Sequence, residues 1–155
     1  CHVTLFDNET KKQTNVLQRN EFDAESPKGH CNRVLCVKFH PSEPIVYSAG
    51  WDQSLQIWDV RSGRHIRTLF GPYVCGDAID ISDNVLLAGS WRTSEQFQMW
   101  DLRTFMQMKT VRWTNNPNEG QGLVYSTKFT SDGKYFLAAA SGVDQIRCYS
   151  METAT

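Results

Sequence analysis

The sequence predicts an all-β fold in which one unit of short strands is repeated along the chain. Short apolar segments alternate with polar residues at a period of two, as half-buried strands do. Clusters of Pro, Gly, Ser, Asp and Asn separate these segments. Trp58 and Trp100, each followed by Asp, lie 42 residues apart, and the same interval separates one pair of glycines, at 29 and 71. Both ends of the unit therefore recur at one period.

Three strands are expected within residues 29–61. Residues 34–39 alternate between apolar and polar side chains, residues 45–49 are mostly apolar, and residues 55–58 alternate again. The intervening segments contain two prolines on one side and Asp, Gln and Ser on the other, which are typical of turns. A further outer strand is expected at residues 65–70, and its counterpart in the next unit at residues 107–113.

The Gly-His opening and Trp-Asp closing of this unit resemble the WD repeat, one four-stranded antiparallel blade of a β-propeller. In that family four side chains form a hydrogen-bonded chain, and the matching positions here hold His30, Ser48, Asp52 and Trp58. A buried imidazole, hydroxyl and indole each need a partner. The resemblance therefore implies a structural network. The competing interpretation, a Ser-His-Asp hydrolase triad, lacks the nucleophile elbow around the serine.

The second unit departs from this pattern. Pro72, Ala88 and Ser94 stand where the first unit has the His, Ser and Asp of the network. The hydrogen-bonded network is therefore expected to be absent there. The turn between the second and third strands is longer than in the first unit and contains Trp91 and Arg92.

The remaining residues complete an arc of about three blades. The chain opens within a blade, and a third unit carries Tyr149 in the Trp position. The expected divisions are the end of an incomplete blade, the first full repeat with its outer strand, the second repeat and a third, degenerate repeat, at residues 1–18, 19–70, 71–113 and 114–155. Within the second of these, residues 19–28 are expected to form an exposed loop.

An open arc of blades would leave apolar faces and strand edges uncovered. We therefore expect this chain to be a segment of a longer one, in which the remaining blades of the same propeller complete the ring. The alternative is a partner, or a second copy, that completes it.

Composition argues against several classes of function. The chain is 40% hydrophobic and 21% charged with a net charge of −1, which does not suggest a nucleic-acid or membrane surface. The histidines and the five cysteines lack metal-ligand spacing, and there is no phosphate-binding loop. Cys36, Cys75 and Cys148 lie in strand patterns and are expected to be core thiols, which favours a reducing, cytoplasmic location. We expect no catalytic, metal or cofactor site and no enzymatic activity.

The family resemblance implies a scaffold for other proteins in a multi-subunit complex. In WD-repeat proteins partners commonly dock on the loops before the first strand and between the second and third strands. Trp, Tyr and Arg are the residue types that dominate interface energies. The matching residues here are Arg33, Leu35, Trp51, Asp77, Trp91, Arg92 and Tyr125. The alternative is that Trp51 and Trp91 simply pack over neighbouring blades.

Two further resemblances suggest particular complexes. Both units contain Trp-Asp-x-Arg, ending at Arg61 and Arg103, which is similar to the motif by which some WD-repeat substrate receptors dock on a cullin-type ubiquitin-ligase adaptor. Segments in both units also resemble large propeller proteins of ciliated and flagellated protists. That resemblance implies a subunit of a cytoskeletal or ciliary assembly.

Overall fold

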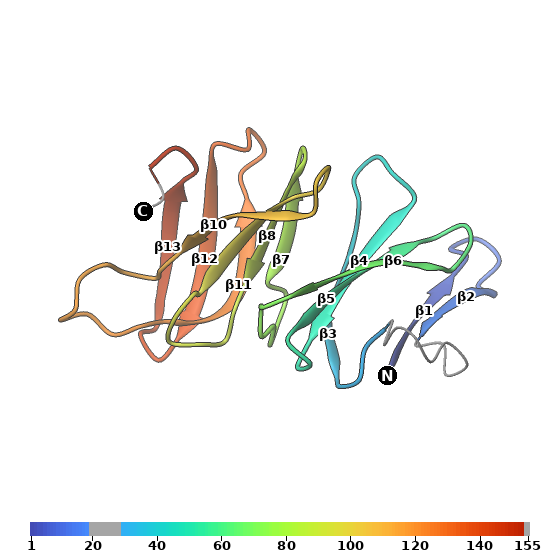
Figure 1. Ribbon diagram of the computed structural model, residues 1–155, viewed down its shortest axis with the longest axis horizontal. Helices are drawn as coiled ribbons and strands as arrows, with labels where there is room; N and C mark the ends of the chain where they lie inside the picture. The colour runs from blue at the N-terminus through green and yellow to red at the C-terminus, as the bar shows by residue number, and fades with distance from the viewer. Residues whose placement is uncertain (19–28, 154–155) are drawn as a thin grey trace.

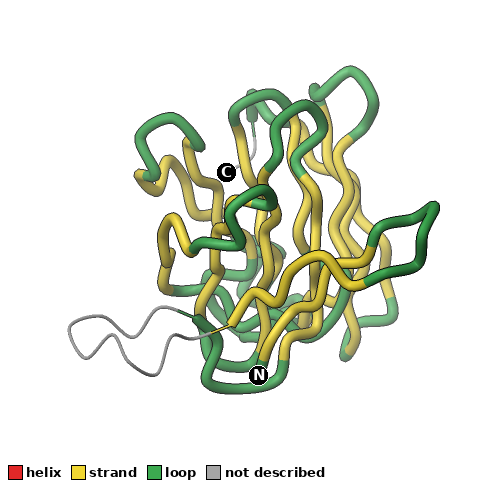
Figure 2. Tube along the Cα trace, turned by 90° about the vertical axis from the view of Figure 1, so that its right-hand side faces the viewer, coloured by secondary structure: helices red, strands yellow, loops and turns green. Residues whose placement is uncertain are grey.

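The chain forms a row of antiparallel sheets with the two termini at opposite ends, as the computed structural model shows (Figure 1). It describes residues 1–18 and 29–153, so the loop expected at residues 19–28 lies outside the described residues. Every regular element of the described residues is a β-strand, and loops connect them (Figure 2). The prediction of an all-β fold made of an open arc of blades is confirmed.

Four sheets make up the arc, and the strands within each follow one another in sequence order. The first sheet has two strands, the second and third have four each, and the last has three. Their strands are β1 (His2–Phe6) and β2 (Gln13–Gln18); β3 (Val34–Phe39), β4 (Ile45–Gly50), β5 (Ser54–Asp59) and β6 (His65–Phe70); β7 (Ile79–Ser82), β8 (Val85–Gly89), β9 (Phe97–Asp101) and β10 (Met106–Val111); β11 (Leu123–Phe129), β12 (Tyr135–Ser141) and β13 (Gln145–Ser150). In this order, we call the four sheets the partial blade, the first blade, the second blade and the third blade.

An aspartate at or just after the end of the third strand in the partial, first and second blades explains the Trp-Asp pairs. The Asp59 carboxylate accepts hydrogen bonds from the backbone N–H groups of Arg61 and Ser62, at 2.8 and 2.9 Å. These bonds close the turn to β6. Asp7 and Asp101 make equivalent bonds in the partial and second blades. These bonds hold the pKa of each carboxyl below its usual value. In each turn one residue adopts a positive φ, such as Gly63 at 67°.

The core lies between blades rather than within them. Trp58 is 1% exposed and packs with Val3, Leu5 and Leu17 of the partial blade. Trp100 packs in the same way in the cluster shared with the first blade, and Tyr149, in the Trp position of the third blade, packs against the second. Each blade therefore turns its Trp-position side chain toward the blade before it.

The opposite face of each blade is covered by the blade that follows, except in the third. Tyr47 and Leu87 occupy equivalent places in the register of their sheets and are 2% and 0% exposed. Their counterpart Leu137 is 43% exposed, and its neighbour Ile146 is 75% exposed. We call Tyr135, Leu137, Ile146 and Cys148 the open face. Cys148, which was expected to be a core thiol, is exposed, because no blade among the described residues lies over its side of β13.

A buried carboxylate on β7 links three blades at their first strands. Oδ1 of Asp80 accepts from the ammonium groups of Lys38 on β3, at 3.0 Å, and Lys128 on β11, at 3.3 Å. Its Oδ2 accepts from the backbone N–H of Phe129 at 2.8 Å. Burial alone would raise the pKa of Asp80, but the bonds from Phe129 and Lys38 outweigh it and lower the pKa. The ionised form is therefore the one that holds the blades together.

Replacing Asp80 with Asn should lower the free energy of unfolding by about 2 kcal/mol near pH 7, because the lysines lose their charged acceptor. A carboxyl whose pKa is lowered on folding stabilises the protein above its unfolded pKa and loses that effect as the pH falls through the folded value. The difference between wild type and Asp80→Asn should therefore narrow below about pH 4. Urea unfolding of both proteins across this range measures it. A difference that stays constant with pH would contradict the role of the ionised carboxylate.

Candidate partner-binding face and the network behind it

Four side chains of the first blade form a continuous hydrogen-bonded chain. The indole Nε1–H of Trp58 donates to Ser48 Oγ at 2.8 Å, and Ser48 Oγ lies 2.8 Å from His30 Nε2. His30 Nδ1 lies 2.7 Å from Asp52 Oδ2, and because a carboxylate only accepts, the imidazole N–H donates there. Imidazole and carboxylate side chains are 1% and 2% exposed. The chain therefore runs from the core of the blade to the turn between β4 and β5.

The network fixes the turn that carries Trp51. Asp52 also accepts from the backbone N–H of Cys31 at 3.0 Å and from the hydroxyl of Ser54 at 2.8 Å. Burial alone would raise the pKa of Asp52, but its bonds to His30 and Ser54 outweigh burial and lower it. One carboxylate thus ties the loop before β3 to the turn after β4. The buried Ser48 hydroxyl is saturated by its two partners, so nothing about it indicates a free nucleophile.

The second blade has no equivalent chain. Trp100 Nε1 is buried, and it has no hydrogen-bond partner among the described residues. Ala88 stands in the register position of Ser48 and is fully buried. The indole therefore contributes apolar burial to the blade but no hydrogen bond.

An aromatic and arginine-bearing surface lies in front of the network, at the start of the first strands. Trp51 stacks on Tyr73 of the next blade, with ring centroids 6.4 Å apart and an interplanar angle of 13°. The Arg33 guanidinium lies 4.9 Å from the centre of the Trp51 ring. The indole N–H of Trp51 donates to the Cys75 sulfur at 3.1 Å.

A second Trp–Tyr pair lies one blade further along the arc. Trp91 meets Tyr125 edge-on, with ring centroids 4.2 Å apart. Gly76 makes room for this pair, because a Cβ there would lie 2.4 Å from the Tyr125 carbonyl oxygen. Arg92 donates a hydrogen bond to the side-chain oxygen of Gln53 in the first blade, so the two turns are connected.

Leu35 and Asp77 complete the set of predicted partner residues. Leu35 is 39% exposed on β3, and Asp77 is exposed just before β7, where its carboxylate accepts from the buried Cys36 thiol at 3.4 Å. Burial raises the pKa of Cys36 to about 12. Tyr73 was missed by the sequence analysis, because its contact with Trp51 joins two blades and leaves no local sequence pattern. We call Arg33, Leu35, Trp51, Tyr73, Asp77, Trp91, Arg92 and Tyr125 the partner face.

The arginines of the Trp-Asp-x-Arg motifs lie at the other end of the blades. Arg61 is exposed in the turn after β5. The Arg103 side chain is 70% exposed and pairs with Asp101 of its own turn at 3.2 Å. Neither belongs to the partner face.

Comparisons with known proteins agree with this architecture. A family model described as "WD domain, G-beta repeat" matches residues 24–59. The chain contains a WD repeat and folds as an arc of a β-propeller. In the same comparisons, the computationally designed proteins Ika4 and Ika8 share its fold. Ika4 gives a TM-score of 0.68 at 16% identity over 96% of this chain and 79% of the other, and Ika8 gives 0.71 at 17% over 98% and 41%.

Two curated relatives are similar to a larger part of the chain than the family model. The small ribosomal subunit protein RACK1 of Neurospora crassa is 29% identical over 116 residues, and the MST50-interacting protein 11 of Pyricularia oryzae is 28% identical over 116 residues. Each alignment covers 74% of this chain and 34% of the relative. The chain therefore spans about a third of the length of these relatives.

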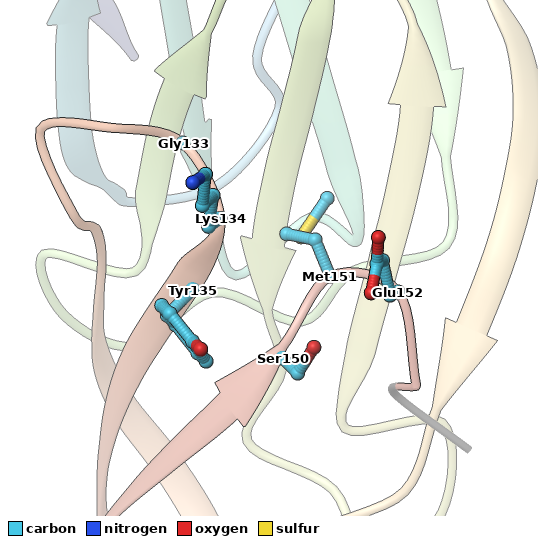
Figure 3. Close-up of a pocket in the computed structure, with 6 residues that line it drawn as sticks. All are labelled: Gly133, Lys134, Tyr135, Ser150, Met151 and Glu152. Atoms are coloured by element: carbon cyan, nitrogen blue, oxygen red, sulfur yellow. The ribbon is translucent and has the colours of Figure 1, made fainter.

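Other kinds of site find little support in the described part of the WD-repeat arc. No group of three or more His, Cys, Asp or Glu side chains is placed there to hold a metal ion. No helix in that part is long and apolar enough to cross a membrane. A hollow of about 400 Å³ lies at the ends of β12 and β13, where Tyr135 and Ser150 line it (Figure 3).

Trp58→Phe should cost more stability than Trp100→Phe, by about 1–2 kcal/mol, because only Trp58 donates a hydrogen bond and its loss leaves the Ser48 and His30 chain incomplete. Both changes remove a similar amount of apolar surface, so each serves as the control for the other. Denaturant unfolding of the two variants measures the difference. Equal losses would show that the network adds no net stability to the first blade.

Proposed function

We propose that this WD-repeat chain is a non-enzymatic scaffold that binds other proteins through the partner face. The observation that carries the proposal is the recurrence of one Trp–Tyr pair with a nearby arginine at the same end of two neighbouring blades. Such side chains combine a large apolar area with a polar group, which suits the centre of a protein–protein interface. Trp51 and Trp91 do pack on the next blade, yet both stay half-exposed. Packing and binding are therefore compatible at these positions.

The comparisons support the class of function. The names of both relatives describe proteins that assemble with others, a ribosomal subunit in one case and a protein named for its interaction in the other. We propose a cytoplasmic location, which also agrees with cysteines that are all free thiols in the described residues. No feature of these residues selects a cytoskeletal or ciliary assembly, so the proposal stops at a protein-binding scaffold.

Trp51→Ala should weaken binding of the protein partner by about thirtyfold or more, because truncating a central aromatic anchor costs about 2 kcal/mol or more. Met106→Ala is the matched control, since Met106 is 67% exposed on the outer strand β10, away from the partner face. Quantitative affinity purification of the full chain from its native cell, with each variant, gives the readout. Retention of every partner by a folded Trp51→Ala variant would contradict the proposal.

The same purification separates the scaffold from the ligase-receptor alternative. Arg61 is exposed and free to reach a partner at the opposite end of the blade. Docking on an adaptor would be lost on Arg61→Ala or Arg103→Ala and kept on Trp51→Ala. That result would replace the partner face with the Trp-Asp-x-Arg motifs as the docking site.

We further propose that another blade covers the open face, either a further blade of the same propeller or one supplied by a partner. The first and second blades bury the side chains equivalent to Leu137, Ile146 and Cys148, which indicates how these positions behave when a neighbouring blade is present. The hollow beside Tyr135 lies at one end of this face (Figure 3). Its apolar side chains would otherwise stand in water.

Ile146→Asp should lower the free energy of unfolding of the full chain by about 2–3 kcal/mol if a blade covers this face, because a carboxylate would then be buried without a partner. Met108→Asp is the control, since Met108 is 58% exposed on an outer strand. Denaturant unfolding compares the two. Wild-type stability for Ile146→Asp would show that nothing covers the open face.

A further inference from the structure

The far ends of the first strands form a groove that the partner face does not use. The partner face lies at the start of β3, β7 and β11, whereas the groove lies where these strands end, at Phe39, Ser82 and Phe129. Its volume is about 290 Å³, and side chains from the first, second and third blades line it. At its base lies the Asp80 carboxylate with its two lysines.

The groove holds more positive charge than its carboxylate can neutralise. Two ammonium groups face one carboxylate, and no other charged side chain lines the groove. Asp77 acts on Lys38 from a greater distance, but it is exposed and lies toward the opposite end of the strands. The Lys128 side chain is 64% exposed, so its charge faces solvent in the groove.

Asp80 already accepts three hydrogen bonds, and the lysines still have protons to donate. Oδ1 accepts from both ammonium groups and Oδ2 accepts from the Phe129 amide. Each ammonium carries three N–H groups and uses one of them on Asp80. The hydroxyls of Ser82 and Ser131 lie along the same groove. These donors face the same groove, and Asp80 is the one carboxylate among the described residues that line it.

We propose that this groove binds a phosphate group, with Lys128 and Lys38 as its main donors. A lysine binds phosphate as a point charge, and two such charges with nearby hydroxyls suit an anion with several acceptor oxygens. Phe39, 59% exposed on the rim, offers an apolar contact for the group that carries the phosphate. Phosphoserine in a partner segment and free inorganic phosphate share this chemistry. The site is separate from the partner face and does not depend on it.

The test uses the full chain and follows the backbone amides of Phe129 and Ser131 by NMR. The probes are inorganic phosphate, a short peptide with phosphoserine beside an apolar residue, and the same peptide with serine. Lys128→Gln should weaken binding of both phosphate probes about tenfold, which corresponds to one charge-assisted hydrogen bond. Lys134→Gln is the matched control, because Lys134 is exposed and lines the other hollow (Figure 3). It removes the same charge without touching the groove.

Each outcome either tests the proposal or identifies where the bound phosphate comes from. Tighter binding of the phosphopeptide, reduced by Phe39→Ala to the level of inorganic phosphate, assigns the phosphate to a partner segment. Equal affinities assign it to the free anion. Unchanged amide signals with both phosphate probes, or equal affinities for Lys128→Gln and Lys134→Gln, would overturn the proposal. Trp51→Ala should leave phosphate binding unchanged, so failure here is distinct from failure of the partner face.

Discussion

The structure depends on burial between blades. A four-stranded sheet has two faces, and a blade turned outward on either side would expose its apolar side chains to water. Here one face of the first and second blades receives the Trp-position side chain of the next blade, and the other face sends its own such side chain to the blade before. A blade is therefore stable only in a row. The third blade shows this requirement most clearly, because it keeps the apolar pattern of the others without the neighbour that would bury it.

This stacking gives the two ends of the blades different properties. At one end the loops before the first strands and the turns after the second strands bring aromatic rings together across blade boundaries. At the other end the first strands converge on Asp80, and the side chains that meet there are charged. Neither surface belongs to a single blade. Any ligand of either surface would contact two or three blades at once, so its binding would depend on how those blades are placed relative to one another.

The strands could be predicted from sequence because their signals are local. Alternation, turn residues and the 42-residue interval each lie within one unit, and the strand bounds differ from the expected ones by at most a few residues. Contacts between units leave no such signal. Nothing in the order of residues indicated that Asp80 would meet Lys38 and Lys128, or that Tyr73 would lie under Trp51. The exposure of Cys148 among the described residues was not foreseen for the same reason, since a strand pattern shows which side chains share a face but not whether anything covers it.

The two halves of the partner face are held in different ways. Trp51 lies on a turn that is held by the hydrogen-bonded chain of the first blade. The His30 and Asp52 side chains of that chain are shielded from solvent. The second blade lacks that chain, and Trp91 is placed instead by its contact with Tyr125 and by the bond from Arg92 to Gln53 at the surface. Surface hydrogen bonds exchange readily with water, whereas a saturated buried network does not. The first half is therefore preorganised for the proposed partner, whereas the second could adjust to it.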